Sequence, residues 1–213
     1  MNARRLWHCS KESEWLAALE SYWQVESAKR NEALERELES LDADSVKKLD
    51  SKGWYEFLLY KYFKWKYTAP NRYATTTTKL KEYESSGKLA DLLVIKSKIF
   101  QFDLENISVG LRTAKSIKGL GIAGASGLLS ILFPKYFGTV DKFLITSLQN
   151  IAIDDSSLRE RVANMNPDCS ISNANGVKLI RILREKATEL NRSFSNEFWT
   201  PRKIDKILWS IER

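Results

Sequence analysis

A glycine-rich stretch near the middle of the chain decides the fold: Lys118-Gly119-Leu120-Gly121-Ile122-Ala123-Gly124-Ala125-Ser126. Upstream, apolar residues recur at helical spacing between Leu104 and Ser116, and downstream an apolar run from Leu128 to Phe133 ends at Pro134. This periodicity predicts a helix on each side of the glycines. The segment is therefore expected to form a helix, a tight hairpin and a second helix.

The predicted hairpin has the features of an anion-binding site. Gly119 and Gly121 allow positive φ and a close approach of another molecule to the backbone. The N-terminus of the helix that starts near Ile122 directs unpaired N–H groups and a partial positive charge toward that molecule. Basic side chains stand nearby, at Arg112, Lys115 and Lys118. A nucleic-acid phosphate is thus the expected ligand.

The same residues allow two other interpretations. Gly119, Gly121 and Gly124 match a dinucleotide-binding pattern, and Asp141 stands 20 residues after Gly121, where a ribose-binding acid could lie. Basic residues interrupt the strand that such a loop needs, however, and the chain lacks βαβ alternation. The second interpretation stays open: the small residues only allow close helix packing, and Asp141 only caps the next helix.

The residues from Leu104 to Ile151 resemble the helix-hairpin-helix and Gly/Pro-Asp signature of the DNA glycosylase superfamily. That superfamily includes endonuclease III, the adenine glycosylase acting on mismatches, 8-oxoguanine glycosylases and alkyladenine glycosylases. Its hairpin pattern, Leu-Pro-Gly-hydrophobic-Gly, is matched by Ile117-Lys118-Gly119-Leu120-Gly121 with lysine in place of proline, and Val140-Asp141 matches its catalytic pair. The closing segment from Trp199 to Trp209 also resembles the last helix of 8-oxoguanine-glycosylase-like bacterial proteins.

This resemblance implies base excision from double-stranded DNA as a repair activity, with oxidised guanine as the first expected base. Asp141 would stabilise the oxocarbenium-like transition state and activate water. Lyase members carry a lysine two residues after the second hairpin glycine, and Ala123 stands there in this chain. We therefore expect a monofunctional enzyme, with Lys118 or another lysine as the remaining source of a Schiff base. The predicted contacts to the DNA backbone are Lys115, Lys118, Gly119, Leu120, Gly121 and Ala123.

Aromatic residues and one loop complete the predicted site. Flipped bases are commonly held by stacking on aromatic side chains. The candidates for the base pocket are therefore Trp54, Tyr60, Trp65 and Trp199. Aromatic residues with interleaved lysines between Trp54 and Tyr67 could instead form an ordinary core face. In glycosylases that the chain resembles, a loop on this side of the cleft fills the gap left by the flipped base. Asn71 and Arg72 are candidates for that role, and a plain Pro-Asn turn is the alternative.

Every strongly periodic segment has the period of a helix, so we predict an all-α fold. The resemblance implies a two-lobed glycosylase-like fold, with one domain over residues 1–213 and the hairpin and Asp141 within residues 104–151. The charge run from Glu26 to Glu39 is interpreted as a solvated helix face. The expected helices are one from Ser10 through Leu41, an aromatic one from Trp54, one from about Tyr73, Leu89–Phe100, Leu104–Ser116, Ile122–Phe133, Lys142–Ile151, Asp155 to about Met165, Val177–Phe194, and a last one capped by Thr200.

Composition narrows the class of protein. The net charge of +7 suits a polyanionic partner. Two distant cysteines and a single histidine argue against a zinc site and against a histidine-dependent triad. No apolar run reaches the ~18 to 20 residues that a membrane span needs, and no signal peptide stands at the start. We expect a cytoplasmic, nucleoid-associated monomer that needs no cofactor, while a structural monovalent cation at the hairpin is left open.

Three rival functions remain on the sequence alone. One is a glycosylase that removes hypermodified bases from phage DNA in defence. Another is a non-catalytic helix-hairpin-helix DNA-binding protein, in which Asp141 is only a cap. The third is a protein-interaction bundle. Steeply salt-dependent duplex binding would fit the first two and not the third.

Overall fold

The computed structural model describes residues 2–212, and every regular element within them is helical, which confirms the all-α prediction. The elements are α1 (Ala3–Trp7), α2 (Glu12–Ser21), the 3-10 turn η1 (Tyr22–Gln24), α3 (Glu26–Arg30), α4 (Glu32–Glu39), α5 (Ala43–Lys47), α6 (Ser51–Glu56), the π-helical segment η2 (Phe57–Tyr62), α7 (Phe63–Lys66), α8 (Pro70–Ser85), α9 (Leu89–Ile99), α10 (Ile107–Lys115), α11 (Ile122–Leu132), α12 (Lys142–Ile151), α13 (Ser156–Val162), α14 (Asn173–Phe194) and α15 (Pro201–Ile211). Within residues 2–212, no helix has both the length and the apolar character needed to cross a bilayer.

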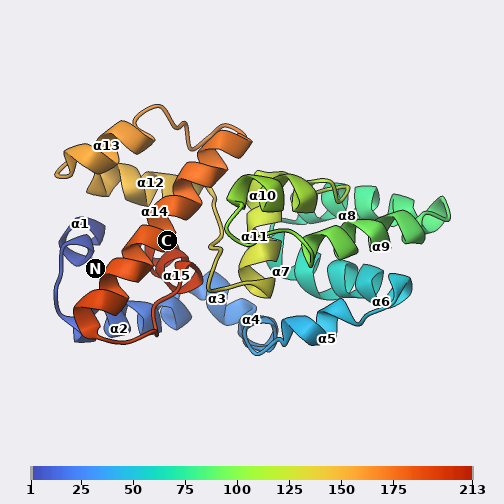
Figure 1. The fold of residues 1–213 in the computed structure, drawn as a ribbon, viewed down its shortest axis with the longest axis horizontal. Helices are drawn as coiled ribbons and strands as arrows, with labels where there is room; N and C mark the ends of the chain where they lie inside the picture. The colour runs from blue at the N-terminus through green and yellow to red at the C-terminus, as the bar shows by residue number, and fades with distance from the viewer. Residues whose placement is uncertain (1, 213) are drawn as a thin grey trace.

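The two ends of the chain share one side of the molecule. Figure 1 shows α1, α2 and α12 to α15 gathered there, while α5 to α9 extend on the other side. Buried tryptophans tie the chain ends together, because Trp15 of α2 packs edge-on against Trp199, with ring centroids 6.0 Å apart. The hairpin helices α10 and α11 lie between the two sides (Figure 1).

Side-chain caps explain where several helices begin. Asp155 accepts a hydrogen bond from Leu158 N at 3.0 Å, and Thr200 accepts one from Lys203 N at 3.3 Å. These bonds satisfy N–H groups that the first helical turn leaves without partners. The predicted starts of α13 and α15 are thereby confirmed.

The predicted single helix from Ser10 through Leu41 is wrong. The chain instead forms α2, η1, α3 and α4 in succession, with Val25 in an extended conformation before α3. The interpretation of Glu26 to Glu39 as a solvated face is also wrong in part, because Glu35 is only 3% exposed. Its partner is Arg202, whose Nη2 lies 2.5 Å from Glu35 Oε1, and so distant a pairing has no local signal in the sequence.

The hairpin forms as predicted, but its two glycines differ in backbone conformation and surroundings. Gly119 has φ of +92°, and a Cβ there would lie 2.6 Å from the carbonyl oxygen of Thr76, so only glycine fits against α8. Gly121 has φ of −90°, which any residue can adopt, so the expectation that Gly121 needs positive φ is wrong. A Cβ at Gly121 would meet nothing within 4 Å, because that residue faces open space.

Candidate functional site

A cavity of about 1120 Å³ opens where the hairpin, α7 and the start of α8 face the start of α12 and the helix α15. It therefore collects residues from both sides of the molecule seen in Figure 1. Two regions of its wall differ in charge and burial. The rim is Arg72, Lys115 and Lys142, and the floor is Glu35, Arg202, Asp205 and Lys206.

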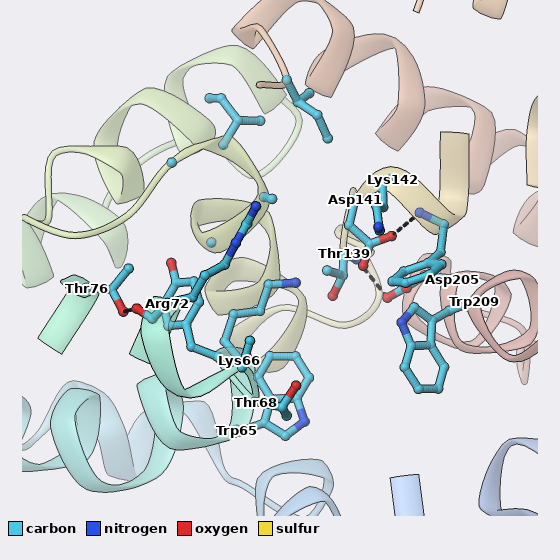
Figure 2. A pocket seen from close by; sticks show the side chains of 18 of the residues that line it. Trp65, Lys66, Thr68, Arg72, Thr76, Thr139, Asp141, Lys142, Asp205 and Trp209 are labelled. Atoms are coloured by element: carbon cyan, nitrogen blue, oxygen red, sulfur yellow. Dashed lines mark hydrogen bonds between the residues drawn. The ribbon is translucent and has the colours of Figure 1, made fainter. Parts of the chain in front are cut away.

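Asp141 lies in the cavity wall as the N-cap of α12. Its Oδ1 accepts hydrogen bonds from Phe143 N at 3.0 Å and from Leu144 N at 3.2 Å, which leaves Oδ2 outside the two capping bonds. Figure 2 shows Asp141 beside Thr139 and Lys142, on the side of the cavity opposite Lys66. Asp141 thus caps a helix and presents a partly buried carboxylate to the cavity at the same time.

The loop between α11 and α12 fixes the position of Asp141. Val140 N donates to Ser126 Oγ at 2.9 Å, and Thr139 N donates to Asp205 Oδ2 at 2.7 Å. A Cβ at Gly138 would lie 2.7 Å from the carbonyl oxygen of Pro201, so the loop passes tightly against the start of α15. The carboxylate is therefore held relative to both α11 and α15.

The N-terminus of α11 opens onto the same cavity. Gly121 and Ala123 line it, and no side chain caps this helix, so N–H groups of its first turn are available to a ligand. Two tyrosines hold the turn in place: Tyr67 Oη donates to Gly119 O at 3.3 Å, and Tyr62 Oη donates to Gly124 O. An uncapped helix N-terminus beside an open glycine suits an anion.

Other predicted hairpin contacts point elsewhere. Lys115 lines the cavity, whereas Lys118 does not, since its ammonium bonds to Glu82 Oε2 at 2.7 Å on α8. That hydrogen bond raises the pKa of Lys118. The side chain of Leu120 is buried and its N–H donates to Ile117 O at 3.1 Å.

The rim carries exposed cations and the floor carries buried ion pairs. Within residues 2–212, no rim residue enters an ion pair, and all three are exposed. In the floor, Arg202 Nη1 lies 2.9 Å from Asp205 Oδ2, and Lys206 is paired with Glu39 of α4. Burial alone would lower the pKa of Arg202, but Glu35 and Asp205 outweigh it and raise that pKa above its ordinary value.

The predicted pocket residues divide into two groups. Trp65, Asn71 and Arg72 line the cavity, and Trp65 is fixed there because its Nε1 donates to Glu35. The structure does not bring the other three to the cavity. Trp54 is fully buried and stacks on Phe57, Trp199 is buried against Trp15, and Tyr60 is 63% exposed on the outer face of η2.

Sequence reasoning did not single out several residues of the cavity. These are Tyr22, Glu35, Lys66, Thr139, Lys142, Phe143, Arg202, Asp205, Lys206 and Trp209. One available signal was the spacing of Arg202, Asp205 and Lys206, which places three charges on one face of an otherwise amphipathic last helix. Comparisons of the chain with protein-family models, with curated proteins and with solved structures found no match.

Proposed function

We propose that this protein is a DNA glycosylase that hydrolyses the N-glycosidic bond of a base flipped out of double-stranded DNA. One observation carries the proposal: the carboxylate of Asp141 and the uncapped N-terminus of α11 line the same cavity. The first can stabilise positive charge on a sugar, and the second can bind the phosphate next to that sugar. Such an enzyme would act as a monomer in the cytoplasm, at the nucleoid.

The cavity wall supplies groups for each part of a nucleotide. The rim suits backbone phosphates, because its three cations are exposed and without ion pairs within residues 2–212. Aromatic side chains that could stack on an extruded base are Tyr22, Trp65, Tyr67, Phe143 and Trp209. Asp141 would stabilise the oxocarbenium-like sugar as the base leaves with the bonding electrons. Water, oriented by the same carboxylate, would then add to C1′ and leave an abasic site.

The test is excision from a panel of duplexes, each carrying one modified base, followed by alkali cleavage at any abasic site. Oxidised guanine comes first, with alkylated and hypermodified bases next. Asp141→Asn should abolish excision and leave duplex binding largely intact, because asparagine keeps the cap but carries no charge. Asp155→Asn is the matched control, since Asp155 also caps a helix but lies outside the cavity lining. Normal turnover by Asp141→Asn would reject the assignment.

A second candidate function is non-catalytic DNA binding. The observation that favours it is the pair of capping bonds at Asp141 Oδ1, the same kind of bond that Asp155 makes. On this reading the cavity grips the DNA backbone, and no duplex of the panel yields an alkali-labile site. Binding would persist with a steep salt dependence.

A further inference from the structure

The cavity wall contains a half-buried lysine, Lys66, whose ammonium group has no hydrogen-bond or ion-pair partner within residues 2–212. Lys66 is the last residue of α7. The rim lysines Lys115 and Lys142 also lack ion pairs within residues 2–212, but they are exposed, whereas the buried Lys206 is bonded to Glu39. Figure 2 shows Lys66 pointing across the cavity toward the side that carries Thr139 and Asp141.

The stem of Lys66 is held in this direction by packing. A Cβ at Gly127 of α11 would lie 3.2 Å from Lys66 Cδ and 3.4 Å from Cε, so the absence of a side chain at Gly127 makes room for the stem. The Nζ also lies 5.8 Å from the ring centroid of Trp65. A long, flexible side chain is thus confined to the cavity, where it points toward the side that carries Asp141 (Figure 2).

The surroundings of Lys66 lower the pKa of its ammonium group. Burial lowers the pKa of Lys66, and the nearby positive charge of Arg202 acts in the same direction. The carboxylates of Asp141, Asp205 and Glu35 oppose this shift, yet the pKa stays below that of an ordinary lysine. A larger fraction of Lys66 is therefore unprotonated at neutral pH than of a surface lysine, and only the unprotonated amine is a nucleophile.

We propose that Lys66 is a nucleophile that forms an imine with the aldehyde of an abasic sugar and so cleaves the DNA strand. The inference rests on the proposed function, which supplies the abasic site, and it replaces the expectation of a monofunctional enzyme drawn from Ala123. The substrate class is a carbonyl compound, the open-chain form of a base-free deoxyribose in duplex DNA.

Each step balances without an added oxidant or reductant. The lone pair of Lys66 Nζ adds to C1′ of the aldehyde, and the resulting carbinolamine takes up one proton from solvent as it loses water, which gives a protonated imine. Asp141 accepts a proton from C2′, the electron pair left behind forms the C2′=C3′ double bond, and the bond from C3′ to its oxygen breaks. The phosphate departs with that oxygen and its electron pair. Water then hydrolyses the imine and restores the amine of Lys66.

The experiment uses the full chain and a duplex with a preformed abasic site, in the presence of borohydride, which reduces an imine to a stable secondary amine. We expect a covalent adduct whose cross-linked peptide contains Lys66. Lys66→Met, which keeps an unbranched stem against Gly127, should lower the trapping rate by about ten-fold or more. Lys66→Arg should lose trapping as well, although it keeps the positive charge. Lys64→Met is the matched control, because Lys64 is an exposed lysine of the same helix outside the cavity lining.

The outcomes separate this inference from the proposed function. The preformed abasic site bypasses base removal, so trapping is measured whether or not any base is excised. Undiminished trapping by Lys66→Arg, or base excision by the wild type without any adduct, would overturn the role of Lys66. Duplex affinity is measured in parallel. If the loss of affinity accounts for the whole loss of trapping in a variant, the role of Lys66 as a nucleophile is also overturned, and Lys66 is a phosphate contact. Failure of every duplex in the excision panel would instead count against the proposed function.

Discussion

The rim and the floor of the cavity both contain basic residues, but these differ in exposure and in ion pairing. Arg72, Lys115 and Lys142 of the rim are exposed and have no ion pair within residues 2–212. Arg202 of the floor is 8% exposed and is bonded to Glu35 and Asp205. Exposed cations contribute little to stability but attract a polyanion, whereas a buried paired cation is costly to disturb. The comparison therefore predicts that the floor holds the fold together and that the rim binds the ligand.

Arg202→Met gives the largest expected effect. Removal of the guanidinium leaves Asp205 buried without its ion pair and leaves Glu35 with only the longer contact to Lys206 Nζ at 3.9 Å, which should lower the free energy of unfolding by about 3 to 5 kcal/mol. Denaturant unfolding followed by circular dichroism measures this change. Arg72→Met is the matched control in the rim, and we expect it to change stability by less than about 0.5 kcal/mol.

A second substitution checks the reason for that loss. Adding Glu35→Gln to Arg202→Met should recover part of the stability, because the amide removes one poorly compensated buried charge. An Arg202→Met variant as stable as the wild type would mean that the floor does not hold α4 against α15.

Neutralising the rim gives the next effect, on DNA binding instead of stability. The triple change Arg72→Ala, Lys115→Ala and Lys142→Ala should reduce the slope of log affinity against log salt by roughly 0.9 for each lost phosphate contact. The measurement is duplex affinity at several salt concentrations. The matched control removes the same number of charges from exposed residues outside the cavity lining, at Lys79, Lys81 and Lys88. Equal loss in the two triples would show that net charge, and not the rim, attracts the duplex.

The local parts of this structure could be predicted from the sequence because their causes are local. Periodicity gave the helical class, and capping residues placed the starts of α13 and α15. The glycine hairpin was predicted from Gly119 and Gly121, although only Gly119 has positive φ. Asp141 was predicted from the resemblance of Val140-Asp141 to a known signature, and it lines the cavity as the N-cap of α12.

The floor could not be predicted, because its members come from α4 and α15, at opposite ends of the chain. The sequence around Glu35 is typical of a solvated helix face, whereas in the structure Glu35 is paired with Arg202 of α15. Tryptophans show the same limit. Trp54, Trp65 and Trp199 look alike in sequence, yet only Trp65 lies in the cavity wall, held there by its bond to Glu35. Tertiary packing decides which aromatic residue of an amphipathic helix faces a cavity and which faces the core.

The smallest expected effect on stability comes from substitution of Asp141, which belongs to neither the rim nor the floor. Two substitutions there distinguish helix capping from the proposed catalytic role. Asparagine caps a helix about as well as aspartate, whereas alanine accepts no bond from Phe143 N or Leu144 N. Asp141→Ala should therefore cost about 1 kcal/mol of unfolding free energy, and Asp141→Asn only a few tenths. Thermal unfolding of both variants beside Asp155→Ala, which loses the equivalent cap of α13, measures these values.

If Asp141 only caps α12, excision and duplex binding should change only as far as stability changes, so Asp141→Asn would behave like the wild type. If it also stabilises a sugar cation, Asp141→Asn should keep its stability and lose excision, and that separation is the result a cap alone does not produce.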